Sequence, residues 1–163
     1  MKLLRLVFFS ILTLFAIASF IGILLPSTVL VSRAVNITAP KDSIIPYLKD
    51  IEKWKGWMDG MQQASVKIES ASHADLAGTM VDITGVTDST IISSWVTKTG
   101  NLQTSTVRVI GDSTQKITIV QWQFEQKLKW YPWERLGSMI NDKILGTMME
   151  KNLNNLKTLV ETK

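Results

Sequence analysis

The sequence predicts an α+β domain behind a single membrane-spanning helix. Twenty uncharged and nearly all apolar residues, from Leu6 to Leu25, form a run long enough to cross a bilayer. Between positions 66 and 128, strand-like segments rich in Thr, Val, Ile and Trp follow one another without a helix between them. A long helical pattern from about 132 to 160 then closes the chain. Strands grouped between helices indicate α+β and argue against a parallel α/β sheet.

The apolar run favours a retained membrane anchor. At about 1.5 Å per residue, twenty helical residues span about 30 Å, the thickness of the hydrocarbon core. A cleaved signal peptide is the main alternative, but its apolar region usually has about 7–15 residues and ends in a small-x-small site. Here Ala16 and Ala18 lie too deep in the run, and Ser19–Gly22 is a poor cleavage site. The third alternative is a buried helix of a soluble protein.

The charges around the run predict its orientation. Lys2 and Arg5 precede it, so the positive-inside rule places the N-terminus in the cytoplasm and the following domain outside. We expect residues 1–26 to form the anchor and residues 27–163 to form one domain. Because Pro26-Ser27 leads directly into a strand, the domain should lie close to the bilayer.

The composition narrows the possible functions. The chain of 163 residues has no cysteine, which excludes disulfides, cysteine nucleophiles and cysteine metal sites. Lys2 and Arg5 are two of its 18 basic residues, so the rest carries 16 basic against 14 acidic residues and no basic run. We therefore expect no nucleic-acid partner. The sequence has neither a phosphate-binding glycine loop nor a G-x-S-x-G elbow. We expect a monomer without a cofactor.

The first strand, Thr28 to Ile37, carries a cation on its apolar face. Its apolar face is formed by alternate residues, namely Val29, Val31, Val35 and Ile37. Arg33 shares this face, where a guanidinium is costly unless it is paired. It either binds an anionic group in a cavity, or forms a structural pair with Asp82 or Glu125, or lies at a sheet edge.

Two short helices and an antiparallel meander should follow. Apolar residues recur at helical spacing after Pro40, and we expect a division near Pro46 or Asp50. The candidate strands are 66–70, 78–86, 90–99, 102–110 and 115–128, with a further break at 73–75. Gly100-Asn101 and Gly111-Asp112 are tight-turn pairs that predict hairpins. The closing helix has an apolar stripe formed by Leu145, Met149, Leu153, Leu156 and Val160.

Two local patterns resemble the SRPBCC superfamily, which includes START-like, Bet v 1-like and polyketide cyclase/dehydrase-like proteins. The first is the opening strand that enters a helix at Ala39-Pro40, followed by Trp54-Lys55-Gly56-Trp57. The second joins the last strand at 120–124 to the helix end at 153–157. The resemblance covers about residues 28–161. It implies a helix-grip fold, in which a curved antiparallel sheet wraps a long C-terminal helix around a cavity that commonly holds lipids, sterols or other apolar molecules.

We expect that cavity to be a hydrophobic pocket between the sheet and the C-terminal helix. The candidate lining residues are Arg33, Trp54, Trp57, Trp95, Arg108, Trp122, Phe124, Leu145 and Met149. The alternative is that these residues simply fill the core, as aromatic residues at strand and helix spacing usually do. Trp54 and Trp57 either gate a pocket mouth or staple the short helices to the sheet. Arg108 shares a strand face with Leu102, Thr104, Thr106 and Ile110 and is open to the same alternatives as Arg33.

Two further features have both a functional and a structural interpretation. Trp130, Tyr131 and Trp133 surround Pro132 and suit a membrane interface, but an ordinary packing corner gives the same pattern. The only histidine, His73, lies in a polar turn, where we expect it to be exposed. No carboxylates accompany it at a spacing typical of a metal site.

The leading functional hypothesis is a membrane-tethered module that binds a lipid-like or other hydrophobic small molecule. One alternative is an enzyme of the cyclase/dehydrase type, which would need polar residues that converge inside the cavity. The sequence identifies no catalytic constellation, so binding without catalysis is the preferred interpretation. The other alternative is a protein-interaction module similar to the co-chaperone branch of the superfamily, which would expose an apolar patch.

Overall fold

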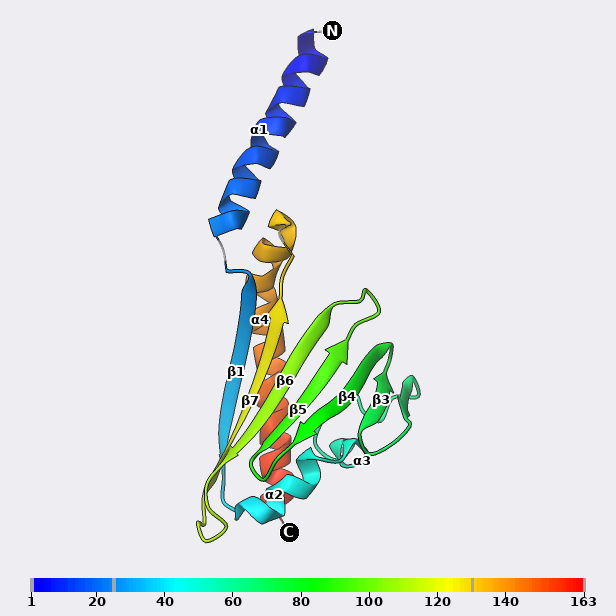
Figure 1. The fold of residues 1–163 in the computed structure, drawn as a ribbon, viewed down its shortest axis with the longest axis vertical. Coiled ribbons are helices and arrows are strands. Elements are labelled where there is room, and N and C mark those ends of the chain that lie inside the picture. The colour runs from blue at the N-terminus through cyan, green and yellow to red at the C-terminus, as the bar shows by residue number, and fades with distance from the viewer. Residues whose placement is uncertain (1, 25, 130, 163) are drawn as a thin grey trace.

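A long N-terminal helix projects from an α+β domain in the computed structural model (Figure 1). The structure describes residues 2–24, 26–129 and 131–162, with the backbone only at 2, 132, 136 and 138–141. The helices are α1 (Lys2–Leu24), α2 (Lys41–Leu48), α3 (Ile51–Trp54) and α4 (Pro132–Glu161). The strands are β1 (Thr28–Ile37), β2 (Val66–Ile68), β3 (His73–Leu76), β4 (Thr79–Val86), β5 (Thr90–Val96), β6 (Leu102–Ile110) and β7 (Thr118–Lys127).

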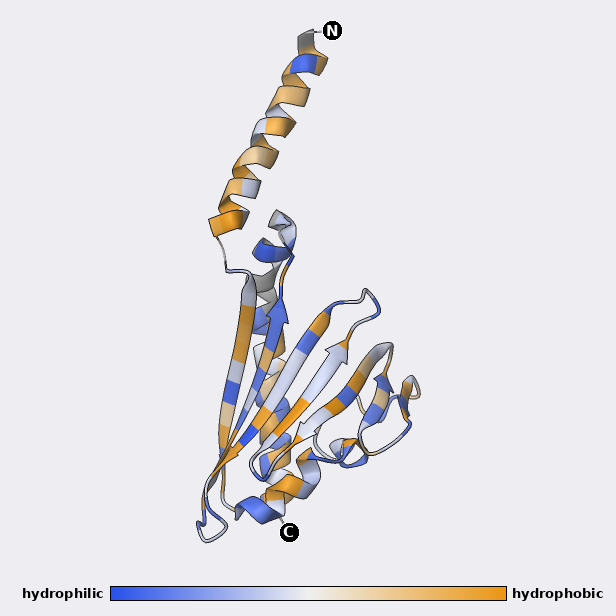
Figure 2. Cartoon of the chain, in the orientation of Figure 1, coloured by the Kyte–Doolittle hydropathy of each residue, from blue (hydrophilic) through white to orange (hydrophobic). Residues whose placement is uncertain are grey.

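Helix α1 keeps its apolar side chains exposed over most of its length. It is apolar almost throughout (Figure 2), and among the described helices it is the one long and apolar enough to cross a membrane. Because nearly all of its described surface is exposed, the alternative of a buried helix is wrong. A signal sequence passes the same test of length and composition, so that alternative stays open.

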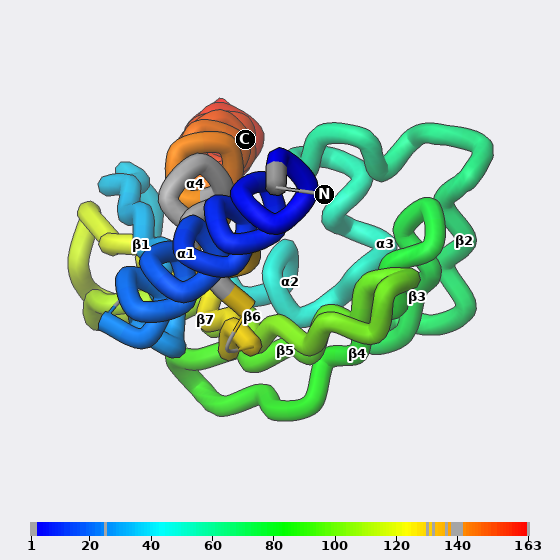
Figure 3. The backbone as a smooth tube through the Cα atoms, turned by 90° about the horizontal axis from the view of Figure 1, so that it is seen from above, coloured from blue at the N-terminus to red at the C-terminus, as the bar shows by residue number. Residues whose placement is uncertain are grey.

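The seven strands form one antiparallel sheet in the order β1-β7-β6-β5-β4-β3-β2. The first strand pairs with the last over its whole length, from Thr28 opposite Lys127 to Ile37 opposite Thr118. Seen from above, the strands follow an arc with α4 on the concave side (Figure 3). A register shift between Ile83 and Gly85 marks a bulge, a device that bends and twists a strand. The helix-grip α+β architecture is confirmed.

One strand of the sheet was missed by the sequence pattern. The break predicted at 73–75 is wrong, because these residues belong to β3. Ala77 and Gly78 both have positive φ values, 55° and 95°, and form a tight turn into β4. The Asp75 carboxylate accepts the backbone N–H of Gly78 and supports this turn. The strand is hard to recognise in the sequence, because His73 and Asp75 are polar and Ala74 is the only fully buried residue of β3.

The two short helices divide at Asp50 and not at Pro46. The Asp50 side chain accepts the Glu52 backbone N–H at 3.0 Å and thereby caps α3. Pro46 lies inside α2 without ending it. As the sixth of eight residues, it costs the short helix one backbone hydrogen bond, the one its N–H would donate to Asp42.

Candidate ligand-binding surface

Five aromatic side chains form a closed ring of contacts on the concave side of the sheet. Trp54 stacks on Trp95 with centroids 6.0 Å apart, and Trp95 meets the edge of Phe124 at 5.2 Å. Phe124 contacts Trp122 at 5.4 Å, Trp122 contacts Trp57 at 5.8 Å, and Trp57 returns to Trp54 at 6.2 Å. The ring therefore joins three strand residues to the segment around α3.

Four members of this ring fill the core and do not line an empty cavity. A side chain that borders a void wider than a water molecule keeps accessible surface, but Trp54, Trp57, Trp122 and Phe124 retain only 4%, 3%, 1% and 3%. Met149 of α4 is fully buried with them. For these five candidates the core-filling interpretation holds in this structure.

Trp54 and Trp57 also staple α2 to the sheet. The Trp54 indole N–H donates to the Leu48 carbonyl at 3.0 Å, and the Trp57 indole N–H donates to the Tyr47 carbonyl at 3.2 Å. Both acceptors lie at the C-terminal end of α2, where carbonyls lack helical partners. These two bonds therefore favour the interpretation that Trp54 and Trp57 staple the short helices to the sheet over the interpretation that they gate a pocket mouth.

Burial changes abruptly between two neighbouring rungs of the sheet. We call a row of directly opposed residues on β5, β6, β7 and β1 a rung. The closed rung, which is buried throughout, consists of Ser93, Ser105, Phe124 and Val31. The open rung, which lies two residues nearer to α1 and is half-buried throughout, consists of Trp95, Gln103, Gln126 and Val29. Leu145, on α4, is also half-buried. The concave face is thus filled at the closed rung and accessible at the open rung.

The polar side chains of both rungs have hydrogen-bond partners on the same face of the sheet. The Trp95 indole N–H donates to the Ser93 hydroxyl at 2.9 Å, and the Trp122 indole N–H donates to the Ser105 hydroxyl at 2.8 Å. The Gln103 amide donates to the Gln126 amide oxygen at 3.1 Å. These groups are neutral, so the open rung presents an aromatic ring and two amides without a formal charge.

Arg33 lies between β1 and α4 in a notch made by a glycine. A Cβ at Gly146 would overlap the Arg33 guanidinium in its present position, so the glycine leaves the room in which the arginine crosses the helix. Its Nε donates to the Glu150 carboxylate at 2.7 Å, and its Nη1 donates to the Ser32 carbonyl at 2.8 Å. The structural-pair interpretation is thus correct, but the partners expected for it, Asp82 and Glu125, are wrong. The sheet-edge alternative also holds, because β1 is an edge strand of the sheet.

Arg108 does not line the concave face. Its neighbours Val107 and Val109 are buried, so the alternation of β6 places Arg108 on the exposed outer face. Its inclusion among the pocket residues is wrong. The physical reason is that side chains alternate between the two faces of a strand, so Arg108 lies on the face of exposed Leu102 and Ile110 and not on that of buried Ser105.

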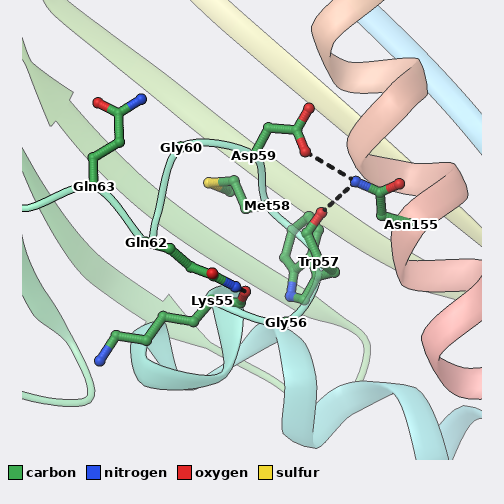
Figure 4. Close-up of a pocket in the computed structure, with 9 residues that line it drawn as sticks. All are labelled: Lys55, Gly56, Trp57, Met58, Asp59, Gly60, Gln62, Gln63 and Asn155. Atoms are coloured by element: carbon green, nitrogen blue, oxygen red, sulfur yellow. Dashed lines mark hydrogen bonds between the residues drawn. The ribbon is translucent and has the colours of Figure 1, made fainter.

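Two asparagines of α4, which the sequence pattern did not single out, hold the segment that carries Trp57. Asn152 is fully buried and accepts the Asp59 backbone N–H at 3.0 Å. Asn155 donates to the Trp57 carbonyl at 3.1 Å and to the Asp59 carboxylate at 3.3 Å (Figure 4). A polar residue beside the apolar stripe of a helix was the available signal for Asn152.

The described surface hollows lie away from the open rung, and two of them bear on the expected pocket. One, of about 440 Å³, is lined mainly by polar groups of residues 55–63 and by Asn155 (Figure 4). The other, of about 900 Å³, lies between the start of α2 and the end of α4 and includes Tyr47, Lys53 and Glu161. The first does not match the expected apolar pocket, and the second lies at the opposite end of α4 from α1.

His73 is half-buried and paired, not exposed as expected. Its Nδ1 bonds to the Asp82 carboxylate, and its Nε2 lies 3.6 Å from Glu69. The hydrogen bond with Asp82 raises the pKa of His73 above its ordinary value of 6.5, although burial acts in the opposite direction. Among the residues that the structure describes, no group of three potential ligands could hold a metal ion.

Comparison with known proteins identifies the fold. No family model and no curated protein matches the chain. A START superfamily protein from Mycobacterium smegmatis is similar over 82% of this chain and 97% of its own, with 15% identity and a TM-score of 0.62. CalU16 from Micromonospora echinospora is similar over 82% of each chain, with 15% identity and a TM-score of 0.57.

A di-domain protein has the same architecture in one part. BexL, a di-domain ARO/CYC from the BE-7585A biosynthetic pathway, matches 84% of this chain over 51% of its own, with 13% identity and a TM-score of 0.62. Likeness at such low identity establishes the fold and leaves the ligand open. This chain has an SRPBCC-type helix-grip fold.

Proposed function

We propose that this chain is a membrane-tethered module that binds a lipid-like or other hydrophobic small molecule at the open rung. The observation that carries the proposal is the change from a fully buried closed rung to a half-buried open rung on one concave face. Residues 1–26 would form the tether and residues 27–163 the binding domain. The N-terminus would be cytoplasmic and the domain outside.

The chemistry of the open rung favours a ligand that is mostly apolar and uncharged. Trp95 and Leu145 offer apolar surface, and the paired amides of Gln103 and Gln126 can orient a hydroxyl or carbonyl group. Arg33, the cation of the concave face, is held by Glu150 in its notch. A ligand with a full negative charge would therefore find no dedicated partner among the described side chains of the open rung.

The position of the open rung gives the ligand a source. Val29 is the second residue of β1 and follows α1 after a short connection (Figure 1). If α1 spans the bilayer, the accessible end of the concave face lies next to the membrane surface. A molecule that leaves the bilayer would then reach the open rung over a short path.

Native mass spectrometry of the full chain, released from lipid nanodiscs, tests this function. We expect a hydrophobic molecule to copurify with the chain and to be lost in Leu145→Trp, because Leu145 is a half-buried candidate lining residue on α4 and a larger side chain would take up space there. Ile92→Trp is the matched control, since it adds an indole on the exposed outer face. Near-UV circular dichroism checks that both variants fold.

The two variants give opposed outcomes. Loss of the bound molecule in Leu145→Trp alone supports the proposal. A chain that carries no hydrophobic molecule, or one whose bound molecule is lost equally in both variants, contradicts it.

The cyclase/dehydrase alternative gains no support from the described side chains. It needs polar groups that converge in the cavity with displaced pKa values. A displaced pKa is found for His73 and for Glu161, and both groups lie at the surface in different parts of the domain. Binding is therefore the function that the geometry supports best.

A further inference from the structure

Arg135 joins the membrane helix to the start of α4. Its Nη1 donates to the Gly22 carbonyl at 2.6 Å and lies 3.4 Å from the Ile23 carbonyl. Both acceptors are in the last turn of α1, where carbonyls lack partners within the helix and carry partial negative charge. The Arg135 Nε also donates to the Lys129 carbonyl at 3.3 Å. One guanidinium therefore connects α1, the β7–α4 connector and α4.

The burial of α1 shows where the two helices touch. Most of α1 is exposed, but Ala18 and Ser19 are half-buried and Gly22 is buried. Gly22 lies four residues after Ala18 and three after Ser19, so the three small residues share one side of the helix and allow close approach of a neighbouring helix. The described contacts of α1 with another element are chiefly those with α4. The packing is thus confined to the end of α1 nearest the domain.

This contact fixes the height of the first turn of α4 relative to the bilayer. Gly22 is two residues from the end of α1, which is a rise of about 3 Å along the helix axis. The headgroup layer on each side of a bilayer is about 5–8 Å deep. If α1 spans the membrane, the first turn of α4 lies at the level of the headgroups.

The residues around that first turn suit such a location. Tyr131 and Trp133 stack with centroids 5.0 Å apart, and Trp133 is 61% exposed. Lys127 and Lys129 are exposed beside them, and the nearby Glu134 carboxylate accepts the Lys129 backbone N–H. Aromatic and basic side chains are the residues that favour a phospholipid interface. Trp130, the third member of the aromatic cluster, lies outside the described residues.

We propose that Lys127, Lys129, Tyr131, Trp133 and Arg135 form a second membrane contact, seated in the phospholipid headgroup layer, that holds the open rung toward the bilayer. We call these residues the junction surface. The proposal rests on the membrane tether of the proposed function. It assigns the aromatic cluster to the membrane interface in preference to a packing corner. Arg135 acts as a positioning residue, because it fixes the angle between α1 and the domain.

Spin labels on the full chain in vesicles of phosphatidylcholine and phosphatidylglycerol test the junction surface. The chain has no cysteine, so single cysteines can be added without other changes. The three sites are Leu12→Cys in the middle of α1, Lys129→Cys in the junction surface, and Thr114→Cys in the β6–β7 hairpin. Power saturation with oxygen and with a water-soluble nickel chelate then reports the depth of each label.

The expected order of depth is Leu12 in the hydrocarbon, Lys129 at the headgroups and Thr114 in water. Arg135→Gln should raise the chelate accessibility of the Lys129 label several-fold, because the domain loses its bond to α1. Arg108→Gln is the matched control, since it removes the same charge from an exposed arginine of β6 outside the junction surface, and it should change the accessibility less.

Two results overturn the proposal in different ways. A Lys129 label as accessible to the chelate as the Thr114 label, with the Leu12 label still deep, removes the junction surface and leaves the tether intact. A Leu12 label that is itself accessible to the chelate removes the tether and the junction surface together. Neither result bears on whether the open rung binds a ligand.

Discussion

The closed rung and the open rung are neighbours on one face of one sheet, yet they differ in burial at every position. Both carry a large aromatic residue, Phe124 in the closed rung and Trp95 in the open one. The segment around Trp57 and the second half of α4 cover the closed rung and the strands below it. The open rung lies beyond that cover, at the end of the domain nearest to α1 (Figure 1).

The difference shows that a strand pattern identifies the concave face without identifying which part of it is accessible. Accessibility depends on where a separate segment of the chain ends. Asn152 and Asn155 set that limit, because they hold the Trp57–Asp59 segment against α4. The two rungs therefore differ in role: the closed rung stabilises the fold, and the open rung is the proposed ligand site.

The largest expected effect is the difference in unfolding free energy between replacing a buried tryptophan, Trp122, and replacing the half-buried Trp95 of the open rung. Trp122→Ala should lower the free energy of unfolding by about 3–5 kcal/mol, because it empties a fully buried site and leaves Ser105 without its indole partner. Trp95→Ala should cost less than half as much, since Trp95 is half-exposed. Urea unfolding of the full chain measures both. Equal costs would contradict the distinction between the ends.

The second-largest effect on stability is expected from Asn152, which holds the Trp57–Asp59 segment over the closed rung. Asn152→Ala should cost about 1–3 kcal/mol, because the Asp59 backbone N–H loses its buried acceptor. Asn154→Ala, an exposed neighbour on α4, should stay within about 0.5 kcal/mol of the parent chain. The same unfolding experiment compares them. If the two variants are equally stable, Asn152 does not hold the cover.

The notch at Gly146 should show coupling of about 1 kcal/mol in a double-mutant cycle. Alanine is favoured over glycine inside a helix, so Gly146→Ala should stabilise the chain once Arg33 is replaced by alanine. With Arg33 present, the new methyl group displaces the guanidinium from Glu150, and the gain should disappear. Additive effects would show that Arg33 does not occupy the notch.

The smallest expected effect lies at the β3–β4 edge. His73 is the only histidine, so its titration can be followed directly by NMR. Its pKa should lie above 6.5 and fall in Asp82→Asn, because the carboxylate stabilises the imidazolium. Because the pKa of His73 is raised in the folded state, the His73–Asp82 pair stabilises the fold below about pH 6.5, and this stabilisation is lost as the pH rises through the folded-state pKa. A pKa at or below 6.5 would contradict the pairing.

The sequence predicts most of the fold because the decisive signals are local. The twenty-residue apolar run and the alternation of β1 each specify their own element. The Gly-Asn and Gly-Asp pairs mark the two hairpin connections, although these connections are longer than tight turns, at 97–101 and 111–117. The exceptions depend on contacts between distant segments. Strand β3 is polar in sequence because two of its residues serve the turn and the His73–Asp82 pair, and its single buried side chain is Ala74.

The site could be predicted only in outline, for the same reason. The sequence places Trp54, Trp57 and Trp122 on the concave side but does not show that they fill it. Arg33 was expected to need a partner, yet Glu150 is 117 positions away and depends on the absence of a side chain at Gly146. Such a pairing becomes visible only when β1 and α4 are placed together.

The indole N–H signals of the full chain in lipid nanodiscs test the central claim most directly. Hexadecanol, a neutral apolar probe with one hydroxyl group, would be added while ¹H–¹⁵N spectra are recorded. We predict a saturable shift of the Trp95 signal, while the signals of Trp54 and Trp122 stay in place. If the Trp95 signal does not move, or if the indole signals of the closed end move as far as it does, the open rung is not the binding site.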